Sequence, residues 1–100
     1  MRARKLSGVT QVRRLFRVSD PKGLHARVAA MVAGVAAQFE ADFVVQRGQA
    51  MASGKSLLGL LCLGAGPGEL LTVVTKGIDA DQAMRVLERL VQQHALMVSV

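Results

Sequence analysis

The sequence predicts a single α+β domain in which a four-stranded antiparallel sheet carries three helices on one face. Its 100 residues, 51% of them hydrophobic, suffice for one domain with a buried core. Four short segments have strand patterns and three have helix patterns, and their order along the chain is βαββαβα. A sheet covered by a layer of helices buries such a set of elements most simply.

The first strand follows a basic lead-in. Residues 1–11 have no regular pattern and are expected to form a flexible arm. Val12–Ser19 alternates as a strand, with Phe16 and Val18 on one face. The turn-forming residues of SDPKG, Ser19–Gly23, then end this strand.

The middle of the chain predicts a helix and a hairpin. Ala26–Gln38 is rich in alanine and too long for a strand, so we expect a buried helix that is apolar nearly all round. Asp42–Arg47 and Gln49–Ala52 have the pattern of short strands, joined in a hairpin at Gly48.

A shorter helix and the last strand follow the hairpin. The leucines of SGKSLLGLLCLG predict the helix, with Ser53 or Ser56 as the cap of its first turn. The stretch GAGPG, Gly64–Gly68, interrupts the chain. Glu69–Lys76 is rich in threonine and valine, which is typical of a strand.

The final helix has a clear start signal and an apolar stripe. Asp79 and Gln82 form a pattern like a capping box, and we expect Ile78 to pack against Ala83 as a hydrophobic staple. The stripe consists of Ala83, Leu87, Leu90, Val91 and His94. The folded domain is therefore expected to span residues 12–96, with residues 97–100 as a tail.

The net charge of +6 comes from the N-terminal end. Its basic residues are Arg2, Arg4, Lys5, Arg13, Arg14 and Arg17, with no acidic residue among them. From Val18 onward, seven basic and seven acidic residues cancel. With only three aromatic residues for base stacking, a nucleic-acid role of the arm is a remote alternative that deletion of residues 1–11 would test.

Hydrophobicity and cysteine content favour a cytoplasmic protein. No apolar run reaches the roughly 20 residues of a membrane span, and no apolar stretch of a secretory signal follows the basic N-terminus. The single Cys62 excludes an internal disulfide and any site with several cysteine ligands. We therefore expect no metal and no other cofactor.

The stretch GLHARVAA, Gly23–Ala30, places a histidine where a loop becomes a helix. The N–H groups of the first turn, among them those of Ala26 and Arg27, lack partners within the helix, and the helix dipole adds positive potential. This end of the helix therefore favours an anion, which the guanidinium of Arg27 can also reach. Because a neutral imidazole is a nucleophile, one coherent interpretation is that His25 accepts a phosphoryl group.

A simpler alternative stays open from the residues alone, in which His25 is an exposed helix cap. No carboxylate and hydroxyl nearby complete a hydrolytic triad. His94, late in the last helix, is expected to be structural. The two histidines and one cysteine have no metal-ligand spacing.

Three motifs together resemble a known family. They are GLHAR followed by an alanine-rich helix, KSLLGLLCLG, and GAGPGELLTVV leading into the last strand. They resemble HPr, the histidine-containing phosphocarrier family of the bacterial phosphoenolpyruvate:sugar phosphotransferase system, over about residues 12–94. The resemblance implies an open-faced β-sandwich and a phosphoryl carrier within a relay, not a stand-alone enzyme.

The resemblance also implies roles for individual residues. His25 would take a phosphoryl group on Nδ1 from enzyme I and pass it to enzyme IIA for sugar uptake, while Arg27 and the backbone of Ala26 hold the phosphate. Ser56 matches a serine that a dedicated kinase phosphorylates in many Gram-positive relatives. The implied partner interface consists of Leu57, Leu58, Leu61 and Ala30, and exposed leucines on a short helix are typical of an interface.

Three departures from the family pattern keep a second function open. Val28 stands where the family usually has proline, which loses about 0.5–1 kcal/mol of preorganisation but adds an N–H near the anion site. Lys22 replaces a small polar residue, and the basic extension before Val12 is unusual. The alternative to a phosphoryl carrier is a divergent regulatory binding protein with little phosphotransfer; the retained His25 favours the carrier, and Val28 favours the alternative.

Overall fold

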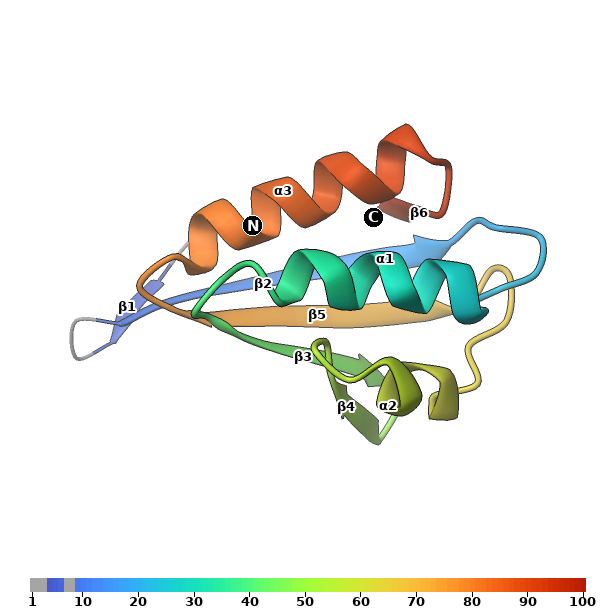
Figure 1. Cartoon of the computed structure of the whole chain (residues 1–100), viewed down its shortest axis with the longest axis horizontal. Helices are drawn as coiled ribbons and strands as arrows, with labels where there is room; N and C mark the ends of the chain where they lie inside the picture. The colour runs from blue at the N-terminus through green and yellow to red at the C-terminus, as the bar shows by residue number, and fades with distance from the viewer. Residues whose placement is uncertain (1–3, 7–8) are drawn as a thin grey trace.

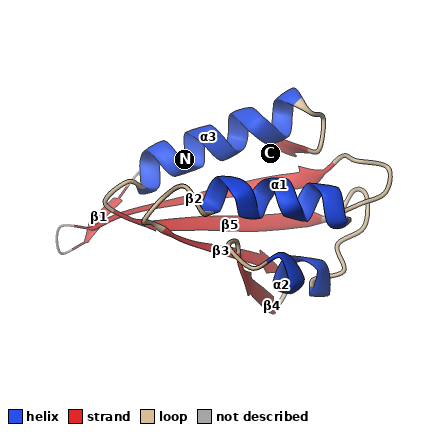
Figure 2. Ribbon diagram, viewed as in Figure 1, coloured by secondary structure: helices blue, strands red, loops and turns tan. Residues whose placement is uncertain are grey.

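The computed structural model describes residues 4–6 and 9–100, in which three helices cover one face of an antiparallel sheet (Figures 1 and 2). The helices are α1 (Ala26–Ala36), α2 (Leu57–Cys62) and α3 (Ala80–Gln93). The strands are β1 (Arg4–Leu6), β2 (Val9–Val18), β3 (Asp42–Arg47), β4 (Ala50–Ser53), β5 (Leu70–Gly77) and β6 (Met97–Ser99). The predicted fold class is confirmed, with two more short strands in the described residues than expected.

The sheet has the order β1-β2-β5-β3-β4, and β6 also pairs with β2. β5 therefore lies between β2 and β3, and every pairing is antiparallel. In Figure 1 the three helices lie side by side across the same face of this sheet. The hairpin of β3 and β4 turns at Gly48, as predicted.

Both unexpected strands pair with the outer edge of β2. β1 pairs with residues 9–11 and β6 with residues 16–18, so the two short strands cover opposite ends of one edge. An uncovered strand edge presents unpaired backbone groups, which explains why three residues suffice at each end. The expectation of an arm and a tail without strands was therefore wrong for residues 4–6, 9–11 and 97–99, whereas residues 1–3 and 7–8 of the predicted arm lie outside the described residues.

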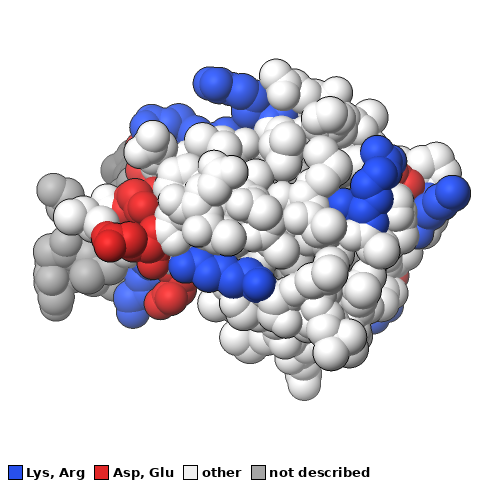
Figure 3. All heavy atoms as spheres, viewed as in Figure 1, with Lys and Arg blue, Asp and Glu red and all other residues white. Residues whose placement is uncertain are grey.

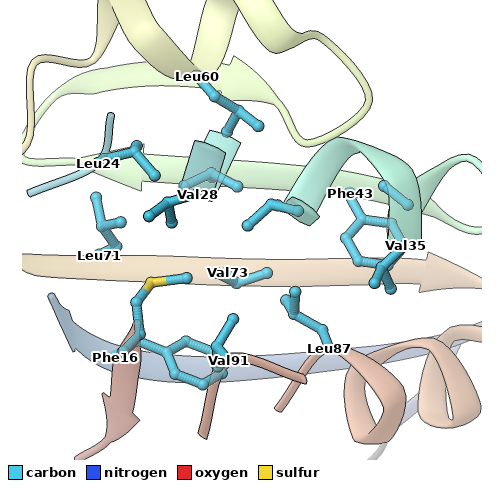
Figure 4. Packing of buried hydrophobic residues seen from close by; sticks show 14 of the residues in the cluster. Phe16, Leu24, Val28, Val35, Phe43, Leu60, Leu71, Val73, Leu87 and Val91 are labelled. Atoms are coloured by element: carbon cyan, nitrogen blue, oxygen red, sulfur yellow. The ribbon is translucent and has the colours of Figure 1, made fainter. Parts of the chain in front are cut away.

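The core lies between the sheet and the helices (Figure 4). Phe16 and Val18 of β2 are buried on the predicted face. The buried residues of α1 are Val28, Ala29, Val32, Val35 and Ala36, and those of α3 are Ala80, Ala83, Met84, Leu87 and Val91. The apolar stripe of α3 ends at Val91, because the helix ends at Gln93 and His94 is exposed.

The start of α3 differs from the sequence prediction. Asp79 is the N-cap residue, but its side chain makes no hydrogen bond to its own helix. Its carboxylate instead accepts hydrogen bonds from the amides of Glu40 (2.9 Å) and Ala41 (2.8 Å). Burial opposes ionisation of this carboxyl, but the amides of Glu40, Ala41 and Asp79 itself, together with the charge of Lys55, hold its pKa below the usual value. The expected capping box was wrong because the carboxylate of Asp79 instead binds the amides of Glu40 and the fully buried Ala41, which lie in a neighbouring loop.

The predicted staple at the same helix was also wrong. Ile78 is 82% exposed and so does not pack on the buried Ala83. In residues 4–6 and 9–100, every helix is too short or too polar to cross a lipid bilayer.

Candidate functional site

The first turn of α1 leaves three backbone donors free. His25 is the N-cap residue, has extended backbone angles (φ −92°, ψ −178°) and makes no side-chain capping bond. The first amide bonded within this turn is that of Ala29, which donates to the His25 carbonyl at 2.9 Å. Among the described residues, no backbone partner accepts from the amides of Ala26, Arg27 or Val28. Three free N–H groups at the positive end of a helix are suited to an anion.

The imidazole ring of His25 has one buried nitrogen and one that is not buried. Nε2 is buried and lies 3.3 Å from Oδ2 of Asp20, too poorly aligned for a hydrogen bond, and it has no other partner in the described residues. The side chain as a whole is 26% exposed, and Nδ1 is not among the buried unpaired atoms. Nδ1 is therefore the ring nitrogen open to a reaction partner.

Asp20 is the residue of this site that the sequence prediction missed. Although only 6% exposed, it accepts a hydrogen bond on Oδ1 from the amide of Lys22 (2.8 Å) and one on Oδ2 from Nη2 of Arg27 (3.3 Å). The Lys22 amide, and after it His25 and Arg27, hold the pKa of the Asp20 carboxyl below its usual value against the effect of burial. In the sequence Asp20 has only the signal of a turn residue, because its approach to His25 depends on how the loop folds back.

Two basic side chains border the start of α1. The side chain of Arg27 is 62% exposed, so that part of its guanidinium remains accessible beside its contact with Asp20. The side chain of Lys22 is exposed, and its backbone amide makes the contact with Asp20. Figure 3 shows Lys and Arg side chains over the end of the molecule where α1 begins, which favours an anionic ligand there.

A second loop supports the one that carries His25. The amide of Leu24 donates to the Ala65 carbonyl at 2.9 Å. Gly23 has a left-handed backbone (φ +72°), and a Cβ atom at this position would lie 2.6 Å from the Ala65 oxygen. Gly23 is therefore required both by its conformation and by the close approach of the GAGPG loop.

The ion pair between Arg47 and Glu69 helps to fix the GAGPG loop. Glu69 accepts on Oε1 from the Gly66 amide (2.6 Å) and on Oε2 from Nη2 of Arg47 (2.7 Å). Nη1 of Arg47 also donates to the Leu63 carbonyl at 3.0 Å. The Gly66 amide and then Arg47 hold the pKa of Glu69 below its usual value, against burial. No sequence pattern indicated this pair, because its members are far apart along the chain.

α2 presents apolar side chains beside α1. Ser56 is confirmed as its N-cap, with Oγ accepting from the Gly59 amide at 2.9 Å. Leu57 is 45% and Leu58 72% exposed, whereas Leu60 is buried in the core. Leu61 is half-buried, and Ala30 on α1 is exposed. The predicted interface residues thus include two exposed leucines on one short helix, and Figure 3 shows uncharged side chains across the middle of this face.

The described residues show no cluster of three His, Cys, Asp or Glu side chains that would hold a metal ion. His94 lies at the C-cap of α3, and Cys62 is exposed at the end of α2. Of the two histidines, only His25 stands at a helix N-terminus.

Comparison with known proteins matches residues 12–93 to the family model described as "PTS HPr component phosphorylation site". The chain is 39% identical over 83 residues to the phosphocarrier protein NPr of Shewanella violacea, covering 83% of this chain and 91% of that protein. The structure resembles the phosphocarrier protein HPr of Bacillus anthracis (34% identity, TM-score 0.72, 77% of this chain and 92% of that one). It also resembles the histidine-containing phosphocarrier protein of Mycoplasma (26% identity, TM-score 0.83, 86% of this chain and 98% of that one).

Proposed function

Because the chain belongs to the HPr family of phosphocarrier proteins of the phosphotransferase system, we propose that Nδ1 of His25 accepts a phosphoryl group from enzyme I and passes it to an enzyme IIA component. The observation that carries this proposal is the position of His25 at the N-terminus of α1. Nε2 is buried, Nδ1 is not, and three free amides lie in the adjoining turn.

The proposed transfer is a displacement at phosphorus. The lone pair of Nδ1 forms a bond to the phosphorus atom, and the bond from phosphorus to the donor breaks with its electrons on the donor. The phosphoryl oxygens then meet the free amides of Ala26, Arg27 and Val28, where the helix dipole favours negative charge. Val28 supplies an amide that proline lacks, so the departure from the family pattern adds a donor.

Arg27 and α2 complete the proposed site. The exposed part of the Arg27 guanidinium supports charge-assisted hydrogen bonds to a phosphoryl group on His25. Leu57 and Leu58 on α2 offer an apolar contact surface to enzyme I and enzyme IIA. Exposed leucines on a short helix are typical of a protein–protein interface.

The test is phosphoryl loading from enzyme I and labelled phosphoenolpyruvate. We expect one acid-labile, base-stable phosphate on the protein, none on His25→Ala and full loading of His94→Ala. Loading lost in His94→Ala and kept in His25→Ala would overturn the assignment. A wild-type chain that binds enzyme I but takes up no phosphate would instead favour the regulatory binding protein.

A further inference from the structure

We propose that Asp20 is a positioning residue for His25, whose carboxylate keeps the ring proton on Nε2 and so leaves Nδ1 free to accept the phosphoryl group. This inference rests on the proposed function, since it concerns the same transfer. It assigns a role to a buried acid that no motif of the sequence singled out.

The carboxylate of Asp20 beside the buried Nε2 favours a proton on that nitrogen. Oδ2 of Asp20, 3.3 Å away, is the polar atom that the described residues bring to it. A carboxylate attracts an N–H and repels a nitrogen lone pair, so this contact is favourable only when Nε2 carries the proton. In a neutral imidazole the other nitrogen then has the lone pair, and the partner of one nitrogen determines the state of the other.

The contact strengthens when the ring becomes charged. At 3.3 Å and with poor alignment, it is weak in the unphosphorylated protein. Once Nδ1 is bonded to phosphorus while Nε2 keeps its proton, the ring carries a positive charge, and charge-assisted N–H···O bonds are shorter and stronger. Asp20 therefore stabilises the positive charge that develops on the ring as the bond from Nδ1 to phosphorus forms, and this lowers the barrier to transfer.

The proton on Nε2 stays in place when the phosphoryl group arrives and when it leaves. When the bond from Nδ1 to phosphorus breaks, its electron pair returns to Nδ1 and the ring becomes neutral. Nε2–H stays paired with Asp20 throughout, so no proton has to enter or leave the buried side of the ring. Neither the uptake nor the release of the phosphoryl group therefore requires a proton transfer at Nε2.

The other partners of Asp20 keep its carboxylate in place. The Lys22 amide binds Oδ1 at 2.8 Å, which leaves Oδ2 for the site. Arg27 donates from Nη2 to that same oxygen at 3.3 Å. A guanidinium that turns from Asp20 to the phosphoryl group leaves Oδ2 to the charged imidazole.

A purely structural role for Asp20 makes a different prediction. The bond from the Lys22 amide to Oδ1 is an Asx turn, and asparagine forms the same turn with its own side-chain oxygen. Asp20→Asn therefore keeps the turn and removes the charge and the second acceptor. Asp81→Asn is the matched control, because Asp81 lies on α3, pairs with the exposed Arg85 at 3.0 Å and changes the net charge equally.

Two measurements test the proposal. The first is the ¹⁵N NMR spectrum of the imidazole nitrogens of His25 in the unphosphorylated protein under alkaline conditions, with Asp20→Asn and Asp81→Asn beside the wild type. We expect Nδ1 to be unprotonated and Nε2 protonated in the wild type and Asp81→Asn, and the proton to move partly or wholly to Nδ1 in Asp20→Asn. The second is the initial rate of phosphoryl loading, which we expect to fall roughly ten- to a hundredfold in Asp20→Asn alone, as for loss of a hydrogen bond to a charged group.

The outcomes separate this proposal from the function on which it rests. Unchanged nitrogen signals and unchanged loading in a folded Asp20→Asn protein would overturn the positioning role while the carrier function stands. If the wild type takes up no phosphate, the proposed function fails, and the NMR comparison still decides whether Asp20 sets the position of the ring proton.

Discussion

The first turns of α1 and α2 differ in whether a side chain accepts hydrogen bonds from their backbone amides. At α2 the hydroxyl of Ser56 accepts a hydrogen bond from the Gly59 amide, so that the helix is capped by its own sequence. At α1 the corresponding residue is His25, which caps nothing and leaves the amides of the first turn free. Asp20, which has a carboxylate able to cap, instead binds the Lys22 amide and Arg27.

The contrast indicates how a helix start becomes a binding site. A capping side chain stabilises a helix by about 1 kcal/mol, so α1 with His25 at its N-cap is less stable by about that amount than it would be with a serine or an aspartate that capped it. α1 tolerates this because its apolar residues are buried in the core and the loop before it is fixed by neighbouring elements. Donors that no protein group accepts from are then available to an outside anion.

The largest expected effect concerns the loop that replaces a cap at α1. We expect Gly23→Ala to lower the free energy of unfolding by about 3 kcal/mol or more, because the added methyl group meets the Ala65 carbonyl and the backbone is left-handed. Gly48→Ala is the control, since Gly48 is also left-handed (φ +58°) but has no atom within 4 Å of an added Cβ. Urea unfolding of both variants measures the difference, and equal losses would show that the approach of the GAGPG loop does not matter.

The second prediction compares exposed and buried leucines of α2. We expect replacement of Leu57 and Leu58 by alanine to weaken enzyme I binding by about 2 kcal/mol or more, as for interface hot spots, with little change in melting temperature. Leu60→Ala in the same helix should instead destabilise the fold, because Leu60 is 1% exposed. Titration calorimetry and thermal melting separate the two effects; a strongly lowered melting temperature in the double variant would place these leucines in the core.

The sequence was most informative where the signal is local. The apolar length of α1, the serine at the start of α2 and the glycine between β3 and β4 were each sufficient to locate an element. The same holds for the place of His25 at a helix start. These features depend on residues within one or two turns of one another.

The features that were missed depend on partners far away in the chain. β1 and β6 are too short to have a pattern and form because β2 offers an edge. The Arg47–Glu69 pair and the contact of Asp20 with His25 arise only when loops are brought together. Asp79 had the local signal of a capping box, but the backbone amides of Glu40 and Ala41 in another loop bind its carboxylate instead.

The third prediction tests the cap of α2. We expect Ser56→Ala to cost about 1 kcal/mol of stability and to leave phosphoryl loading near the wild-type level. Ser56→Asp should keep the fold, because aspartate caps as well as serine, and should slow loading of His25 by placing charge beside Leu57 and Leu58. Ser53→Asp is the charge control on the preceding strand. Loading of Ser56→Asp at the wild-type rate with sub-saturating enzyme I would leave Ser56 as a cap only.

The smallest expected effect concerns pH: the stability change caused by a substitution near the start of α1 should depend on pH, and that caused by a substitution at the start of α2 should not. The pKa of Asp20 is lowered in the folded protein by the Lys22 amide, His25 and Arg27, so its ionised form stabilises the fold. That contribution is fully present above the carboxyl's unfolded pKa and is lost as the pH falls through the folded pKa. Asp20→Asn should therefore be less stable than the wild type near neutral pH, and the difference should vanish in acid, where Asp20 is protonated and resembles asparagine. The deficit of Ser56→Ala should persist across the same range, because a hydroxyl cap does not titrate. Urea unfolding of the three proteins from about pH 7 to about pH 2 measures this; a difference between Asp20→Asn and the wild type that stays constant with pH would mean that the charge of Asp20 adds nothing to stability.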